Sequence, residues 1–153
     1  MDDLLIRLHA HDWASEPRSE WNSPQDVPPA LIAAWRGESD AYDRLMAVLA
    51  NNHAGTWYPV LLPAMPFLHE VLAQAPADGV AAVLGLLDDF VYSFDVEPSS
   101  PQLDRQRELA FRDALVPIRQ TAAAIAATQP QHADMALDLI DGIDARLAGS
   151  RDR

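Results

Sequence analysis

Apolar residues recur along most of the chain at helical spacing and form one-sided stripes. Over residues 39–52 the stripe consists of Tyr42, Leu45, Met46 and Leu49, with polar side chains between them. Over residues 79–94 it is longer and consists of Val80, Val83, Leu84, Leu87, Val91 and Phe94. No run of alternating β-branched residues indicates a strand. The pattern therefore predicts an all-α fold of about six to seven helices.

Proline, glycine and polar capping residues set the predicted boundaries. A short first helix over 2–8 precedes an ordered irregular loop at 10–28, which Trp13 and Trp21 pin. Further helices are expected at 30–38 with Gly37 near its end, at 39–52 capped by Ser39 or Asp40, and at 57–74, 79–94, 102–129 and 131–147. Asp78 is expected to cap the helix at 79, and Pro117 to kink or break the one at 102–129. We expect a single domain over 1–153, with a frayed tail at 148–153.

The spacing of the helices bears on their arrangement. Short connections predict antiparallel hairpins, which either wrap into a bundle or stack as a solenoid. The helices predicted to begin at 39, 57 and 78 start about twenty residues apart, so that a pair occupies about forty, the size of a HEAT or armadillo unit.

Charge is the clearest feature of the composition. The chain has 23 acidic residues against 11 basic ones, all of them arginine, and a formal net charge of −12. This charge repels phosphates, so nucleic acids and anionic membranes are disfavoured as partners, and a basic protein is favoured. The alternative is an acidic surface that only maintains solubility. The absence of cysteine excludes disulfides and thiolate chemistry, and the charged start of the chain and the lack of a long apolar run predict a cytoplasmic protein.

Residues 51–72, NNHAGTWYPVLLPAMPFLHEVL, look most like a site. His53 beside Thr56 and Tyr58 could act in proton transfer. A structural interpretation explains more: Gly55 takes a left-handed conformation that ends one helix, Thr56 caps the next, and Pro59 falls in its first turn. His53, Gly55, Thr56 and Tyr58 are accordingly predicted to form a structural turn. Pro63 and Pro66 are predicted to bend the following helix.

Three segments carry a resemblance to a known family: HDW at 11–13, DVPPAL at 26–31 and HAGTWYPVLLPAMPFLHEVL at 53–72. Together they resemble bacterial HEAT-repeat-like proteins, which show a His-Gln-Gly-Thr turn and a Val-Pro-Phe-Leu helix. Ala54 replaces the usual Gln, and Leu61-Leu62 stand where Ala-Thr is common. The resemblance covers about residues 10–95. It implies a helical repeat fold without a catalytic centre and, for members encoded beside secreted toxins, an immunity role.

Candidate catalytic chemistry is sparse. His9, His11 and Asp12, together with His53, are the best candidates for a metal-dependent enzyme, although helix termination also explains the first two histidines. Asp88 and Asp89 are adjacent, so on a helix they point about 100° apart and cannot flank one substrate bond. We therefore predict no catalytic residue, no metal and no cofactor.

The predicted function is a non-enzymatic protein-binding module, with an immunity-type protein that neutralises a basic toxin as its sharpest form. The expected partner-binding residues are four acids and two exposed aromatic residues: Asp88, Asp89, Asp95, Glu97, Tyr92 and Trp57. A small metal-dependent enzyme that uses His9, His11, Asp12 and His53 and a self-associating helical-repeat protein remain as alternatives.

Overall fold

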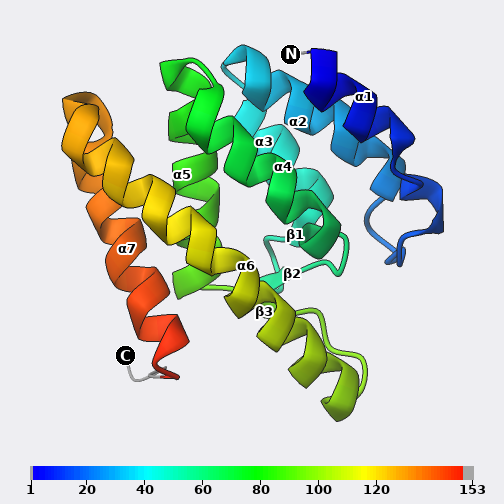
Figure 1. The fold of residues 1–153 in the computed structure, drawn as a ribbon. Helices are drawn as coiled ribbons and strands as arrows, with labels where there is room; N and C mark the ends of the chain where they lie inside the picture. Colours follow the sequence, from blue (N-terminus) through cyan, green and yellow to red (C-terminus); the bar gives the residue numbers. More distant parts are fainter. Residues whose placement is uncertain (1, 150–153) are drawn as a thin grey trace.

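Helical hairpins stacked side by side make up the fold, which Figure 1 shows as a ribbon of a computed structural model. The structure describes residues 2–149. Within that range the helices are α1 (Asp2–Ala10), α2 (Val27–Arg36), α3 (Ala41–Leu49), α4 (Leu61–Gln74), α5 (Ala77–Tyr92), α6 (Pro101–Thr128) and α7 (Ala133–Leu147). The predicted all-α class and number of helices are confirmed.

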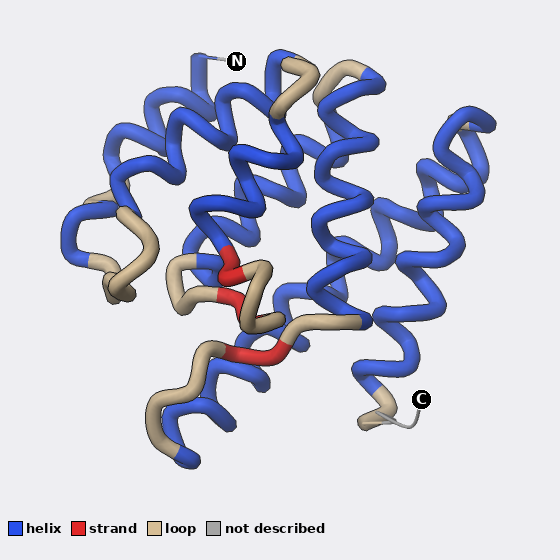
Figure 2. The backbone as a smooth tube through the Cα atoms, turned by 180° about the vertical axis from the view of Figure 1, so that it is seen from behind, coloured by secondary structure: helices blue, strands red, loops and turns tan. Residues whose placement is uncertain are grey.

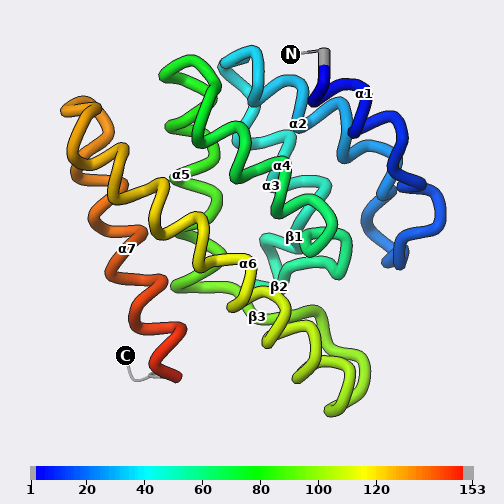
Figure 3. Tube along the Cα trace, in the orientation of Figure 1, coloured from blue at the N-terminus to red at the C-terminus, as the bar shows by residue number. Residues whose placement is uncertain are grey.

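The helices form two layers. Helices α2, α4 and α6 pack in one layer and α3, α5 and α7 in the other, while α1 lies against α2 (Figures 1 and 3). Each helix of the first layer also packs on the helix that follows it in the chain. The hairpins therefore stack in sequence order and do not close into a four-helix bundle, a choice that periodicity left open.

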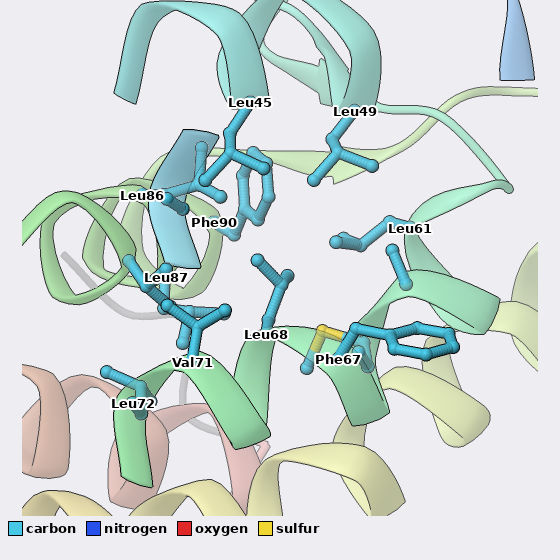
Figure 4. Packing of buried hydrophobic residues seen from close by; sticks show 14 of the residues in the cluster. Leu45, Leu49, Leu61, Phe67, Leu68, Val71, Leu72, Leu86, Leu87 and Phe90 are labelled. Carbon is cyan, nitrogen blue, oxygen red and sulfur yellow. The ribbon is translucent and has the colours of Figure 1, made fainter. Parts of the chain in front are cut away.

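One cluster of buried apolar side chains fills the space between the layers. Figure 4 shows its centre, where side chains of α3, α4 and α5 meet: Leu45, Leu49, Leu68, Val71, Leu86, Leu87 and Phe90. The stripes read from the sequence supply this core, because Leu45, Leu49, Val83, Leu84 and Leu87 are all buried. The hydrophobic effect of this burial holds the layers together.

Two helix ends follow the expected chemistry. Gly37 has a φ of +68° just after α2, and the N–H groups of Gly37 and Glu38 donate to the carbonyls of Ala34 and Ala33. Ser100 caps α6, its hydroxyl accepting from the Leu103 N–H at 3.4 Å.

Other predicted helix features are wrong. The break predicted at Pro117 is wrong, because helix α6 continues through this residue. Pro63 falls in the first turn of α4, where a proline removes no hydrogen bond. Of the two prolines, only Pro66 therefore removes a backbone hydrogen bond from inside that helix. Asp78 lies inside the first turn of α5, since the helix already begins at Ala77. Asp40 does precede α3, but its side chain binds Arg44 rather than a backbone N–H.

A small sheet replaces the predicted start of α4. Strands β1 (Ala50–Asn51) and β2 (Thr56–Trp57) pair antiparallel, and β3 (Asp95–Val96) pairs parallel to β2. Figure 2 shows the three strands in red at one end of the helices. The backbone N–H of Tyr58 donates to the Leu49 carbonyl at 2.8 Å. Because these backbone groups are committed to pairing, α4 begins at Leu61 instead of at residue 57.

The long connection between α1 and α2 includes the 3₁₀ turns η1 (Trp13–Ser15) and η2 (Pro24–Asp26). Trp13 pins its first half, because its indole N–H donates to the Leu8 carbonyl at 2.8 Å and its ring packs on Phe67. A third 3₁₀ turn, η3 (Pro130–His132), leads into α7.

Among the described residues, no helix is both long and apolar enough to cross a membrane. Of the predicted frayed tail, residues 150–153 lie outside the described residues, as does Met1.

Candidate functional site

A cavity of about 420 Å³ lies between the α1–α2 loop, the C-terminal end of α3 and the β1–β2 turn. These segments lie on the same side of the molecule in Figure 3. The lining is mainly apolar and aromatic, with a few amide and imidazole groups: Trp21, Met46, Ala47, Ala50, Asn51, Asn52, His53 and Tyr58. Its size falls within the range of about 300–1,000 Å³ typical of ligand sites.

Trp21 is the most exposed large side chain of this site, with 70% of its surface accessible. The loop that carries it is nevertheless fixed by Asn22, which is only 6% exposed. The Asn22 side chain accepts from the Ser19 N–H at 2.9 Å and donates to the Val48 carbonyl at 3.2 Å. The prediction that Trp21 pins the loop is therefore wrong: a buried asparagine does so and leaves the indole exposed.

The predicted structural turn at residues 53–58 has a different geometry from the one expected. Gly55 has a φ of +65°, but it lies in the β1–β2 connection and not at the end of α3. Thr56 belongs to β2, so it does not cap α4. The Asn51 side chain organises the turn by accepting from the Ala54 N–H at 3.1 Å. His53 is exposed at the rim of the cavity.

Tyr58 forms the floor of the site and is almost completely buried. Burial raises the pKa of its phenol, an interaction with the Ser19 side chain lowers it, and the charge of Glu97 raises it. Glu97 lies next to Tyr58, because its backbone N–H donates to the Trp57 carbonyl at 2.9 Å. Its own pKa is raised, mainly because partial burial disfavours the carboxylate, while Arg107 acts in the opposite direction.

The four predicted partner-binding acids differ in their surroundings. Asp95 is exposed in β3 and Glu97 is half-buried just after it. Asp88 and Asp89 are half-buried near the C-terminal end of α5. The Asp89 carboxylate accepts a hydrogen bond of 2.5 Å from the Tyr42 hydroxyl.

The two predicted aromatic contacts also differ. Trp57 is 0% exposed and packs on Phe111 with ring centroids 5.2 Å apart, so its prediction as an exposed contact is wrong. Its place in β2 points the ring into the core, a fact that a helical pattern could not predict. Tyr92 is 39% exposed, and its hydroxyl donates to the Asp138 carbonyl at 3.1 Å.

The histidines of the metal hypothesis are dispersed. His11 pairs with Glu16 at 2.7 Å, and its ring contacts that of Trp13 in a tilted arrangement with centroids 4.3 Å apart. His9 is exposed in the last turn of α1. Within residues 2–149, no group of three or more His, Asp or Glu side chains is arranged to hold a metal ion.

Sequence reasoning identified His53 and Tyr58 but missed Trp21, Asn51 and Asn52 as members of one site. Apolar periodicity carries no information about an irregular loop. The sequence alone therefore does not distinguish the exposed Trp21 from the buried Trp13. The double asparagine before His53 was the available signal, since asparagine is typical of tight turns.

Comparison of the chain with protein families, curated proteins and solved structures finds no match.

Proposed function

We propose that the chain is a non-enzymatic protein-binding module whose partner is a basic protein. The observation that carries this proposal is the exposure of Trp21 on a loop fixed by the buried Asn22. Tryptophan is enriched among residues that dominate protein–protein affinity, and an ordered loop loses little entropy on binding. Because the loop is already ordered, its exposed indole can contact a partner with little loss of conformational entropy.

The charge of the chain supports a basic partner. The net charge of −12 attracts a positively charged protein and accelerates its association. Exposed acids lie around the site: Glu20 directly before Trp21, Asp43 one helical turn before Ala47, and Asp95 in β3. The finer form of the proposal is an immunity-type protein of the cytoplasm that neutralises a basic toxin, which rests on the resemblance of residues 10–95 to HEAT-repeat-like proteins.

The test begins with capture of a binding protein from native extract, followed by stopped-flow association with the purified partner. We expect the association rate constant to fall steeply as salt increases, because screening weakens long-range attraction. The variant with Glu20, Asp43 and Asp95 all changed to Lys should associate about tenfold more slowly at low salt.

A matched variant carries three Lys changes at exposed acids in α6 and α7, Asp113, Asp134 and Asp141. It has the same net charge as the first, so it separates local from global electrostatics. If both variants slow association equally, only the net charge of the chain matters and not the position of the acids around the site. An association rate constant that does not change with salt concentration would exclude a basic partner.

A further inference from the structure

The cavity beside Trp21 combines an apolar wall with hydrogen-bond acceptors. Met46, Ala47 and Ala50 supply the apolar surface. Asn51 and Asn52 place amide groups at its edge, and each amide oxygen has two lone pairs. The Asn51 oxygen uses one of its positions for the Ala54 N–H, so acceptor capacity remains. A purely aliphatic ligand would bury part of this polar edge without pairing it, which costs free energy.

The charges near the cavity include the exposed Arg18 and Arg44 as well as exposed acids, while the chain as a whole is strongly acidic. No arginine is found among the described residues that line the cavity. The backbone N–H of Glu97 donates to the Trp57 carbonyl at 2.9 Å, next to Tyr58 at the floor. The exposed Glu20 lies directly before Trp21, and the exposed Asp43 lies one helical turn before Ala47. Arg44 is paired with Glu38 and Asp40, so the net charge of −12 determines the sign of the potential that a ligand meets. An anionic ligand is disfavoured, and a cationic one is attracted.

From this combination we infer that the cavity takes an arginine side chain of the partner protein, stacked on the indole of Trp21. A guanidinium is planar, weakly hydrated and rich in donors, so it can stack on an aromatic ring while donating to amide oxygens. Its aliphatic stem matches the wall formed by Met46 and Ala47. A lysine ammonium is more strongly hydrated and does not stack in this way.

This inference rests on the proposed function and names the side chain that the site recognises. A second copy of the chain is a poor donor of that side chain, because two molecules of net charge −12 repel each other. A neutral apolar side chain is the other possible occupant, and the test below distinguishes it.

The test uses three synthetic tripeptides, N-acetyl-Gly-X-Gly-amide, in which X is arginine, citrulline or norleucine. Citrulline keeps the shape of arginine without its charge, and norleucine keeps only an apolar stem. Binding is followed by the NMR signal of the indole N–H of Trp21, which is 70% exposed and lines the cavity. Trp13 and Trp57 are buried, and the half-buried Trp35 in α2 does not line the cavity. We expect saturable shifts with the arginine peptide. The citrulline and norleucine peptides should bind at least about tenfold more weakly.

Two variants locate the site. Ala47 is exposed and lines the cavity, so Ala47→Phe should fill the space and abolish the shift. Ala123 is exposed in α6 away from the cavity, and Ala123→Phe should leave binding unchanged. Equal binding of citrulline or norleucine, or retained binding in Ala47→Phe, overturns the inference.

The same materials separate the two proposals. If the purified protein partner binds and Trp21→Ala weakens it, but the arginine peptide gives no shift, the arginine site is wrong and the binding module stands. If the partner binds Trp21→Ala as tightly as the original chain, the assignment of the module's binding surface also fails.

Discussion

The guanidinium of Arg146 in α7 binds the carboxylate of Glu108 in α6 through two hydrogen bonds, Nε to Oε1 at 3.0 Å and Nη2 to Oε2 at 2.8 Å. Its Nη1 donates to the carbonyls of Phe90, Val91 and Phe94 at the end of α5, at 2.6, 3.2 and 3.0 Å. One arginine therefore joins three helices and supplies donors to carbonyls that the end of α5 leaves free.

Replacement of Arg146 by Met should lower the free energy of unfolding by about 3 kcal/mol. Arg146 is only 5% exposed, so its removal leaves the carbonyls of Phe90, Val91 and Phe94 without this donor inside the protein. Glu108 loses its two hydrogen bonds from Arg146 and keeps the one from Arg112 at 3.2 Å. Urea denaturation followed by circular dichroism measures the change. The matched control is Arg44→Met, because Arg44 pairs with Asp40 at the surface and should lose less than about 1 kcal/mol. Similar losses in both variants would contradict a special role for the buried pair.

Two glycines of α5 should respond in opposite directions to alanine. A Cβ added at Gly79 would lie 2.0 Å from the Ala34 carbonyl oxygen, so α2 and α5 could not keep their spacing. Gly79→Ala should therefore destabilise the fold by about 2 kcal/mol or more. At Gly85 the nearest atoms lie 3.8 Å away, and alanine should stabilise the helix by up to about 1 kcal/mol. Thermal unfolding of both variants checks the signs, and stabilisation by Gly79→Ala would refute the close approach of the two helices.

The hydrogen bond between Tyr42 and Asp89 predicts a change in alkaline stability. Burial first, and then the bond to the Asp89 carboxylate, raise the pKa of Tyr42 from 10.0 to about 12. Since the pKa is higher in the folded state, this stability is fully present below pH 10 and is lost as the pH rises toward 12. A phenolate absorbance titration should show a late step that Tyr42→Phe removes. Urea denaturation at pH 9 and pH 11 should show a smaller loss in the variant. Disappearance of an early step near pH 10 would contradict the assignment.

Much of the fold could be predicted because the helices carry their own signals. The apolar stripes of α3 and α5 and the glycine at the end of α2 are local features, and each is found where the sequence places it. The small sheet could not be predicted, because strands of two residues have no periodicity and exist only where distant segments meet. The errors at Thr56 and Trp57 follow from that single omission.

The candidate site was harder to predict than the fold, because it depends on tertiary contacts of single residues. Trp13 and Trp21 occupy the same predicted loop, yet one is buried and the other is exposed. The difference arises from Asn22, whose partner carbonyl belongs to Val48, far away in the chain. An isolated sequence gives no indication of which of two tryptophans faces inward.

Asn22→Ala should make the Trp21 loop more mobile while the helices stay folded. The change removes the hydrogen bonds to the Ser19 N–H and the Val48 carbonyl, so the free energy of unfolding should fall by about 1–2 kcal/mol. Trp21 itself remains, but its indole should become mobile on the nanosecond timescale, and the NMR order parameter of its N–H should fall while that of Trp13 stays constant. Binding at the cavity should weaken as well, because the loop must then be ordered during association.

Gln25→Ala, at an exposed position of the same connection, is the control and should change neither the free energy of unfolding nor the order parameter of Trp21. An unchanged Trp21 order parameter in Asn22→Ala would show that contacts other than the Asn22 amide hold the loop in place.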